Sequence, residues 1–453
     1  MRETDSWPMP ATPSDDTIRA MLAQRVEACR LSPGMVVGIT ERGDRRLIAH
    51  GRADAFGSSL TEGALFEIGS VTKLFTVLLL ADMACRREVS LDEPVVALLP
   101  TGVRVPERNG RAITLAHLAT HLSGLPCLPT NFEPNDPANP YADYTAERLY
   151  DFLSACELAR TPGDTFEYSN LGVGLLGHAL ALRGGIDYAT LVQSRILVPL
   201  GMNATAVGLS GMLAARLAPG HDDSLEPVAG WDFAALAGSG GFRSCAADLL
   251  LFLEALIAPD TSPLGLAAGI LVAPPEQRGL GLGLLPPEGH MRLQHEGRTG
   301  GYCSYVGCIS AWRRGVVVLA NAAVYGAVAD LGVHILDTRW APLWHRQEVA
   351  IDPMTFDRLV GRYRINPTMV LDVTRAEDRL FVQPTGQAAC RFFPTSERQF
   401  FCKAVGAQIT FEPGPNGRVA RLILHQNSRD QIAERVGIDG VGGCAGRPAG
   451  AKR

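Results

Sequence analysis

The sequence predicts an α+β domain followed by a small all-β domain. Strand patterns lie near both ends of the first domain, at residues 35–40, 46–50, 292–294, 303–309 and 316–320. The section between them, about 70–290, is rich in helical patterns that Pro and Gly interrupt. Strands from both ends of a segment, with helices between them, predict one antiparallel sheet flanked by helices and a helical subdomain.

The other elements follow in chain order. We expect an amphipathic helix over 18–30, a hairpin turn at 42–44, a last helix over 328–340 and a linker near 345–352. Beyond the linker, turns separate short apolar or aromatic runs at 370–373, 380–382, 392–393, 400–402, 409–411 and 419–424. This pattern predicts a β-barrel or sandwich. The expected divisions are a domain at 15–345, a second at 352–436 and a disordered Gly/Ala-rich tail at 437–453.

Composition excludes several classes of protein. The chain has 453 residues, of which 46% are hydrophobic and 20% charged, and this fits a globular protein with a large core. A net charge of −5 without a basic stripe argues against nucleic acid as a partner. The ten cysteines form no Cys-x-x-Cys pair, so we expect reduced thiols rather than a disulfide framework or zinc ribbon.

The same residues predict where the chain works. The N-terminus shows no apolar core of a signal peptide, and the most apolar run, 74–81, is too short to span a bilayer. We therefore expect a cytoplasmic protein without a membrane span. Its oligomeric state is left open.

The tetrad Ser70-Val71-Thr72-Lys73 opens a helix that is apolar almost all round. Residues three apart are neighbours on a helix, so the tetrad brings a hydroxyl and an amine together. A serine needs a base to become nucleophilic, and a buried lysine can lose its proton near neutral pH. Taken alone, the tetrad also fits a serine that caps the helix and a lysine in its first turn.

Two later segments offer partners for this pair. Tyr168-Ser169-Asn170 follows a turn at 162–164 and precedes an apolar run. A tyrosine near an ammonium ionises more easily and can shuttle protons, and Asn170 can bridge Lys73 and a substrate amide or carbonyl. His295-Glu296-Gly297 ends a strand pattern and leads into a Gly-rich turn, where small residues let a substrate approach the backbone. Separately, each segment also fits a core tyrosine, a helix cap or a surface histidine.

In this order, Ser-x-x-Lys, Tyr-x-Asn and His-x-Gly resemble the serine hydrolases of the class C β-lactamase and penicillin-binding-protein fold. Further stretches are similar to that family at 66–69, 113–126, 199–205 and 240–244. The resemblance covers about residues 15–345. The C-terminal part resembles the lipocalin-like β domain that some family members carry.

The resemblance implies a role for each site residue. Ser70 would attack a carbonyl and become acylated, while Lys73 and Tyr168 would share the proton transfers as a coupled pair. Asn170 would orient Lys73 and the substrate. Backbone N–H groups of Ser70 and of Arg298, which follows the His295–Gly297 triad, would form the oxyanion hole.

One departure from the family pattern narrows the activity. Typical class C β-lactamases carry lysine where this chain has His295, and histidine is mostly neutral near pH 7. This favours an esterase or a D-amino-acid peptidase or amidase over efficient β-lactam hydrolysis. Two alternatives stay open: an acyltransferase or peptide-cyclising enzyme, and a non-catalytic β-lactam-binding protein. The expected partner is a small-molecule or short-peptide acyl substrate.

Other motifs are interpreted as structural. Gly172–Gly177 matches G-x-G-x-x-G but follows no strand, so it does not predict a dinucleotide site. His117 and His121 lack the glutamate of H-E-x-x-H, and we expect no metal and no cofactor. Gly238–Gly241 is expected to be a wall near the site, and the proline-rich stretch 126–144 an ordered loop beside it.

Overall fold

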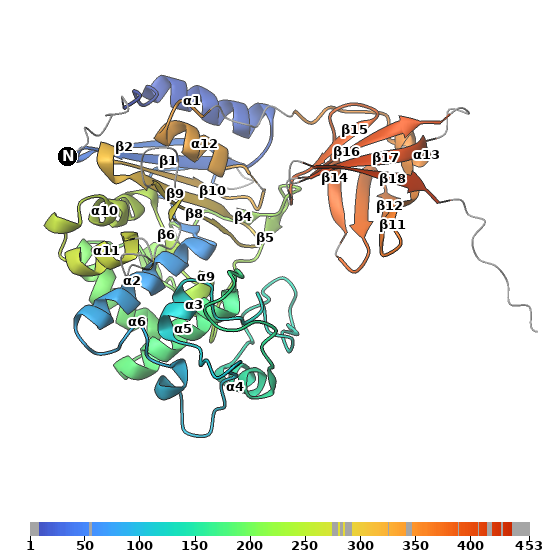
Figure 1. Ribbon diagram of the computed structural model, residues 1–453. Helices are drawn as coiled ribbons and strands as arrows, with labels where there is room; N and C mark the ends of the chain where they lie inside the picture. Colours follow the sequence, from blue (N-terminus) through green and yellow to red (C-terminus); the bar gives the residue numbers. More distant parts are fainter. Residues whose placement is uncertain are drawn as a thin grey trace, which may run out of the picture. The chain divides into compact units, whose positions relative to one another are not determined.

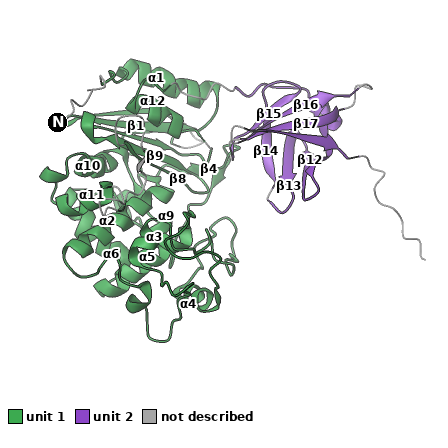
Figure 2. Cartoon of the chain, in the orientation of Figure 1, with its two compact units in different colours: residues 1–345 green, residues 346–453 purple. Residues whose placement is uncertain are grey.

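The computed structural model describes residues 9–53, 57–273, 280, 284–285, 292–324, 326–340, 347–387, 389–405, 407–414, 419–426 and 429–436. The chain divides into two compact units, residues 1–345 and 346–453 (Figure 2). The disordered tail predicted at 437–453 lies outside the described residues. Within the described part, no helix has the length and apolar character needed to cross a membrane.

Unit 1 is built on an antiparallel six-stranded sheet in the order β2-β1-β10-β9-β8-β7. Its strands are β1 (Gly34–Glu41), β2 (Asp44–Gly51), β7 (Leu284–Leu285), β8 (Arg292–Arg298), β9 (Cys303–Ile309) and β10 (Arg314–Ala320). The N-terminal hairpin pairs with the late strand β10, with Met35 opposite Ala320. This arrangement confirms the predicted α+β fold, in which one sheet closes from both ends of the domain.

Alternate residues of the buried strands face two separate cores. Met35 and Val37 of β1 pack with helices α1 (Asp15–Ala23) and α12 (Ala329–Leu336), whereas Val36 faces α10 (Ala246–Ile257). Figure 1 shows α1 and α12 covering one face of the sheet and α10 covering the other. The helices predicted over 18–30 and 328–340 are shorter in the structure. Helix α1 is followed by a π-helical turn at Gln24–Ala28, and α12 ends at Leu336.

The helical part of unit 1 centres on two apolar helices, α2 (Thr72–Cys85) and α5 (Asn170–Gly184). Around them stand α3 (Leu115–Ala119), α4 (Ala146–Ala155), α6 (Tyr188–Val192), α7 (Val198–Leu200), α8 (Gly211–Ala214), α9 (Ala237–Gly240) and α11 (Gly265–Val272). Two short ribbons, β3 (Phe66–Glu67) with β6 (Arg243–Ser244) and β4 (Gly220–His221) with β5 (Pro227–Val228), complete the unit. The G-x-G-x-x-G segment lies inside α5, where Gly174 and Gly177 allow α9 to pack closely.

Unit 2 is a closed antiparallel barrel of eight strands, as the short apolar runs beyond the linker predicted. The strands are β11 (Gly361–Asn366), β12 (Met369–Ala376), β13 (Arg379–Pro384), β14 (Cys390–Pro394), β15 (Gln399–Cys402), β16 (Ala407–Pro413), β17 (Val419–Gln426) and β18 (Arg429–Arg435), with a short helix α13 (Phe356–Leu359) before them. Its core is filled with side chains such as Tyr363, Leu380, Phe400 and Phe411. The sequence analysis missed β11 and β18, where Tyr363 and Ala433 are the fully buried residues.

Candidate active site

Ser70 stands where a single 3₁₀ turn, Gly69–Val71, leads into α2. The turn places Ser70 and Lys73 on one side of the chain. Ser70 is half-buried and Lys73 is fully buried. The Lys73 Nζ lies 2.9 Å from the Ser70 Oγ and donates a second hydrogen bond of 2.6 Å to the carbonyl of Ser239. The predicted hydroxyl–amine pair is therefore in contact, and α9 supplies a third partner from the stretch expected to be a wall.

Burial changes the protonation of the amine. Desolvation lowers the pKa of Lys73 to about 7, and the nearby Cys127 side chain opposes this by a smaller amount. Roughly half of the amines are then neutral at pH 7. A neutral amine within hydrogen-bonding distance of a hydroxyl can accept its proton.

Tyr168 is the second side chain in contact with the Ser70 hydroxyl. Its hydroxyl donates to the Ser70 Oγ at 2.8 Å, and its ring centroid lies 5.0 Å from the Lys73 Nζ. Desolvation raises the pKa of Tyr168 to about 12, although the hydrogen bond to Ser70 lowers it. The expectation that this tyrosine ionises more easily is wrong, because desolvation outweighs any stabilisation by a lysine that is itself only partly charged. Tyr168 is a proton donor at neutral pH.

Asn170 begins α5, and its position is set by the residue before it. Ser169 caps the helix: its Oγ accepts from Gly172 N at 2.8 Å and donates to the carbonyl of Pro126 at 2.6 Å. The Asn170 amide donates to the Tyr141 hydroxyl at 3.4 Å and forms no hydrogen bond with Lys73. The expected bridge to Lys73 is thus absent from this arrangement. The buried Asn170 Oδ1 accepts no hydrogen bond from the described residues.

Strand β8 runs against the turn that carries Ser70. A Cβ on Gly297 would lie 1.9 Å from the carbonyl oxygen of Ile68, and one on Gly69 would lie 2.6 Å from the backbone N of Arg298. Gly69 also has a φ of +48°, which favours glycine. These two glycines allow the backbone of Arg298 to approach the Ser70 turn, where the family resemblance implies a pair of N–H donors.

His295 lies on the same strand and is half-buried. Its Nδ1 donates to the carbonyl of Glu296 at 2.8 Å, so the lone pair of the neutral ring is on Nε2. Desolvation, and next the charge of Lys73, lower the pKa of His295 to about 4. The ring therefore supplies no positive charge at pH 7.

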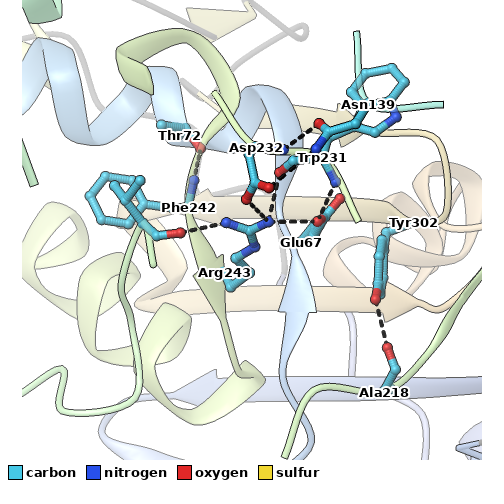
Figure 3. Close-up of polar contacts among 10 residues, drawn as sticks. Glu67, Thr72, Asn139, Ala218, Trp231, Asp232, Phe242, Arg243 and Tyr302 are labelled. Carbon is cyan, nitrogen blue, oxygen red and sulfur yellow. Dashed lines mark hydrogen bonds and ion pairs between the residues drawn. The ribbon is translucent and has the colours of Figure 1, made fainter. Parts of the chain in front are cut away.

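Residues that the sequence analysis did not single out form a polar network beside the site (Figure 3). Arg243, which is buried, donates to the carboxylates of Glu67 and Asp232 at 3.1 Å each and to the carbonyl of Trp231 at 2.6 Å. Asn139 and Asp232 exchange two hydrogen bonds. The network therefore fixes the segment around Trp231 to both the β3–β6 ribbon and the proline-rich loop.

An aromatic group extends from this network toward Asn170. The Tyr141 ring stacks on Phe233, with 4.4 Å between centroids, and lies 5.5 Å from the Trp231 ring. Tyr141 belongs to the stretch predicted to be an ordered loop near the site, and its hydroxyl is the partner of the Asn170 amide. Tyr141 lies about ninety residues before Trp231 and Phe233 in the sequence, so no local pattern could have revealed this aromatic group.

The two histidines interpreted as structural have different surroundings. The side chain of His117 closes a capping box with Thr114 at the start of α3. His121 packs on Tyr168, with 4.6 Å between ring centroids. In the described part of the chain, no group of three or more His, Cys, Asp or Glu side chains is placed to hold a metal ion.

Family models match both parts of the chain. The model of the Beta-lactamase family matches residues 18–338, and a family described as a domain of unknown function (DUF3471) matches residues 345–435. The chain is 32% identical over 203 residues to the D-alanyl-D-alanine-carboxypeptidase/endopeptidase AmpH of Escherichia coli, a match that spans 44% of this chain and only half the length of that relative. Penicillin-binding protein 4* of Bacillus subtilis is 26% identical, over 83% of this chain and 89% of its own.

Solved structures agree with the family model. A class C β-lactamase from Rhodobacter sphaeroides superposes with a TM-score of 0.55 and 26% identity, covering 68% of this chain and 93% of that one. The family model spans the sheet, both apolar helices and the Ser70, Lys73 and Tyr168 contacts described above. The chain belongs to the β-lactamase family.

Proposed function

We propose that the chain hydrolyses an ester or amide through an acyl-enzyme on Ser70. The observation that carries the proposal is the pair of short contacts at the Ser70 Oγ, 2.9 Å to the Lys73 amine and 2.8 Å to the Tyr168 hydroxyl. One partner has a pKa of about 7 and the other of about 12, so a base and an acid flank the same oxygen.

The proton transfers follow from these two values. Neutral Lys73 takes the Ser70 proton while the Oγ forms a bond to the substrate carbonyl carbon. The N–H groups of Ser70 and Arg298 stabilise the negative oxygen, and each such donor typically contributes about 10²–10³ in rate. Tyr168 protonates the leaving amine or alcohol and is reprotonated from Lys73. Water then attacks the ester by the reverse route, which releases the acid and restores the serine.

Three features support an uncharged substrate with an N–H on its acyl side. The Asn170 Oδ1 is a buried acceptor without a partner among the described residues, and a substrate amide N–H would satisfy it. Beside it, Tyr141, Trp231 and Phe233 offer apolar surface. Neutral His295 provides no fixed charge for a carboxylate on the leaving group. We therefore propose an ester or amide of an N-acylated amino acid, and the names of the relatives favour the D-configuration.

Intact-mass spectrometry during turnover tests the proposal. We expect the p-nitrophenyl ester of N-acetyl-D-alanine to add one acyl group to the protein, and the adduct to clear as product forms. Ser70→Ala should abolish both adduct and turnover, while Ser154→Ala, an exposed serine on α4, should change neither. An adduct that persists in Ser70→Ala would overturn the nucleophile assignment.

A substrate panel tests the specificity. Replacing the substrate N–H by a methylene should lower kcat/KM roughly tenfold, the equivalent of one hydrogen bond to a buried acceptor. A free terminal carboxylate on the leaving group, as in acyl-D-Ala-D-Ala, should lower it as well. Equal rates for the amide and methylene compounds would remove Asn170 Oδ1 from substrate recognition, and preference for the carboxylate would contradict the role given to His295.

A further inference from the structure

His121 occupies an unusual position in the backbone. It follows α3 with a φ of +60°, in the left-handed region that residues other than glycine rarely adopt. It is also buried, with 1% of its surface exposed. Such a conformation typically costs about 1–3 kcal/mol and persists where the surroundings impose it.

Every residue from Phe166 to Ser169 contacts this one histidine. The Glu167 backbone N donates to the His121 carbonyl at 2.8 Å, and the Ser169 backbone N donates to the His121 Nδ1 at 3.1 Å. The rings of Tyr168 and Phe166 lie 4.6 and 5.6 Å from the imidazole, the first tilted by 34° and the second edge-on at 78°. The backbone bonds alternate with the ring contacts along the segment.

The imidazole is held in one protonation state. Because the Nδ1 accepts a hydrogen bond, the neutral ring carries its proton on Nε2. Desolvation, followed by the charges of Lys73 and His295, lowers the pKa of His121 to about 3, so this form persists across the working pH range. The buried Nε2 has no hydrogen-bond partner among the described residues, and a buried group of this kind usually destabilises a fold by about 1–3 kcal/mol.

Tyr168 needs external support because its segment is irregular. Residues 165–169 belong to neither a helix nor a strand, and Tyr168 is 37% exposed. No ladder of backbone bonds therefore fixes the phenol 2.8 Å from the Ser70 Oγ. The ring of His121 lies against one face of the phenol, and its Nδ1 anchors the next peptide.

We propose that His121 is a positioning residue that holds the Tyr168 hydroxyl against Ser70 for protonation of the leaving group. The proposal rests on the function proposed above for Tyr168. A misplaced donor slows departure of a strongly basic leaving group but matters little when the leaving group needs no proton. The loss should therefore appear in kcat for a methyl ester and hardly at all for a p-nitrophenyl ester.

Two variants test the hydrogen bond and the ring contact of His121 separately. His121→Asn keeps an acceptor for Ser169 N and tolerates a positive φ, whereas His121→Phe keeps a ring against Tyr168 and loses the acceptor. Each should lower kcat on the methyl ester roughly 10–100-fold and on the p-nitrophenyl ester less than about threefold, with little change in KM. His117→Phe, which removes a cap four residues away, should leave both values of kcat unchanged.

A double-mutant cycle separates positioning from a general structural effect. Added to Tyr168→Phe, either His121 variant should slow the methyl ester less than about twofold further, because the group it positions is already gone. The proposal would be overturned if the effects of the His121 and Tyr168 substitutions on kcat multiplied in the double variant. It would also be overturned if a His121 variant lowered kcat equally for the two esters. If Tyr168→Phe alone keeps the wild-type rate, the proposed function fails instead.

A surface variant keeps the test valid if substitution of the buried histidine prevents folding. Phe166 is 64% exposed, so Phe166→Ala should fold while removing one contact of the imidazole. We expect kcat on the methyl ester to fall severalfold, roughly 3–10-fold, with the p-nitrophenyl ester unaffected. An unchanged ratio of the two rates in folded Phe166→Ala would contradict the proposal.

Discussion

Lys73→Met should make unit 1 more stable at neutral pH and should abolish turnover. Lys73 is fully buried, and its pKa falls from 10.5 in the unfolded chain to about 7. At about 1.4 kcal/mol per pKa unit, this fall corresponds to about 5 kcal/mol of folding free energy at pH 7 and below. Hydrogen bonds from Lys73 to Ser70 and Ser239 are lost in the variant, so we expect a net gain of about 1–3 kcal/mol.

The sign follows from proton binding in the two states. Between pH 10.5 and about 7, the unfolded chain binds a proton at Lys73 that the folded chain does not. The free energy of unfolding therefore falls by up to about 1.4 kcal/mol for each pH unit lowered in this window, and the contribution is constant below it. Lys73→Met should lack this slope, so its gain in stability over the wild type should shrink as the pH rises and reverse once the lost hydrogen bonds outweigh the remaining burial penalty.

Urea denaturation at pH 7, 8, 9 and 10 measures the effect. All five tryptophans precede residue 345, so tryptophan fluorescence reports unit 1 without the barrel. Lys403→Met, which replaces a buried lysine of unit 2 directly after β15, is a control that should leave the fluorescence transition unchanged. Parallel stability curves for wild type and Lys73→Met over this pH range would refute the depressed pKa and, with it, the role of Lys73 as a base.

Three further predictions concern the same site. The value of kcat/KM should rise with pH through about 7 as Lys73 loses its proton, and a rate that falls over this range would exclude a neutral amine as the base. Gly297→Ala should abolish activity and destabilise unit 1 by roughly 3 kcal/mol or more, because the new Cβ would lie 1.9 Å from the Ile68 carbonyl oxygen. Thermal melts measure the loss, and Gly269→Ala is the matched control because a Cβ there would meet no atom within 4 Å. Glu67→Gln should lower the stability of unit 1 by about 3 kcal/mol in urea, because it weakens a buried ion pair, and an unchanged midpoint would contradict this.

The sequence could predict the fold and part of the site because both depend on local patterns. Helical periodicity places Ser70 beside Lys73, and the strand patterns at both ends of unit 1 already predict how its sheet closes. The roles assigned to the site residues stay predictions until variants are measured. The two missed strands of the barrel show the limit, because a strand with a single fully buried side chain gives almost no alternating pattern.

What could not be predicted depends on backbone groups and on packing. The acceptor of Lys73 is a carbonyl of Ser239, and residue type does not reveal where a carbonyl points. The pKa of Tyr168 rises because desolvation exceeds the effect of its neighbours, a balance that no spacing encodes. His121 gave only a negative signal in the sequence, yet its left-handed backbone connects it to four consecutive residues.

Burial of the amine is enough to explain why stability and reactivity conflict at Lys73. The apolar packing that fills α2 removes water from Lys73, and this single cause both destabilises the folded state and provides a base at neutral pH. Desolvation also raises the pKa of Tyr168 and lowers that of His295, so it reinforces the protonated phenol and the uncharged imidazole that both groups already favour at pH 7. One physical effect thus makes Lys73 available as a base at neutral pH and strengthens the uncharged forms of the other two groups. A change that admits water beside α2 should therefore alter all three together, raising the pKa of Lys73 and lowering that of Tyr168, whereas loss of a single hydrogen bond should alter only one.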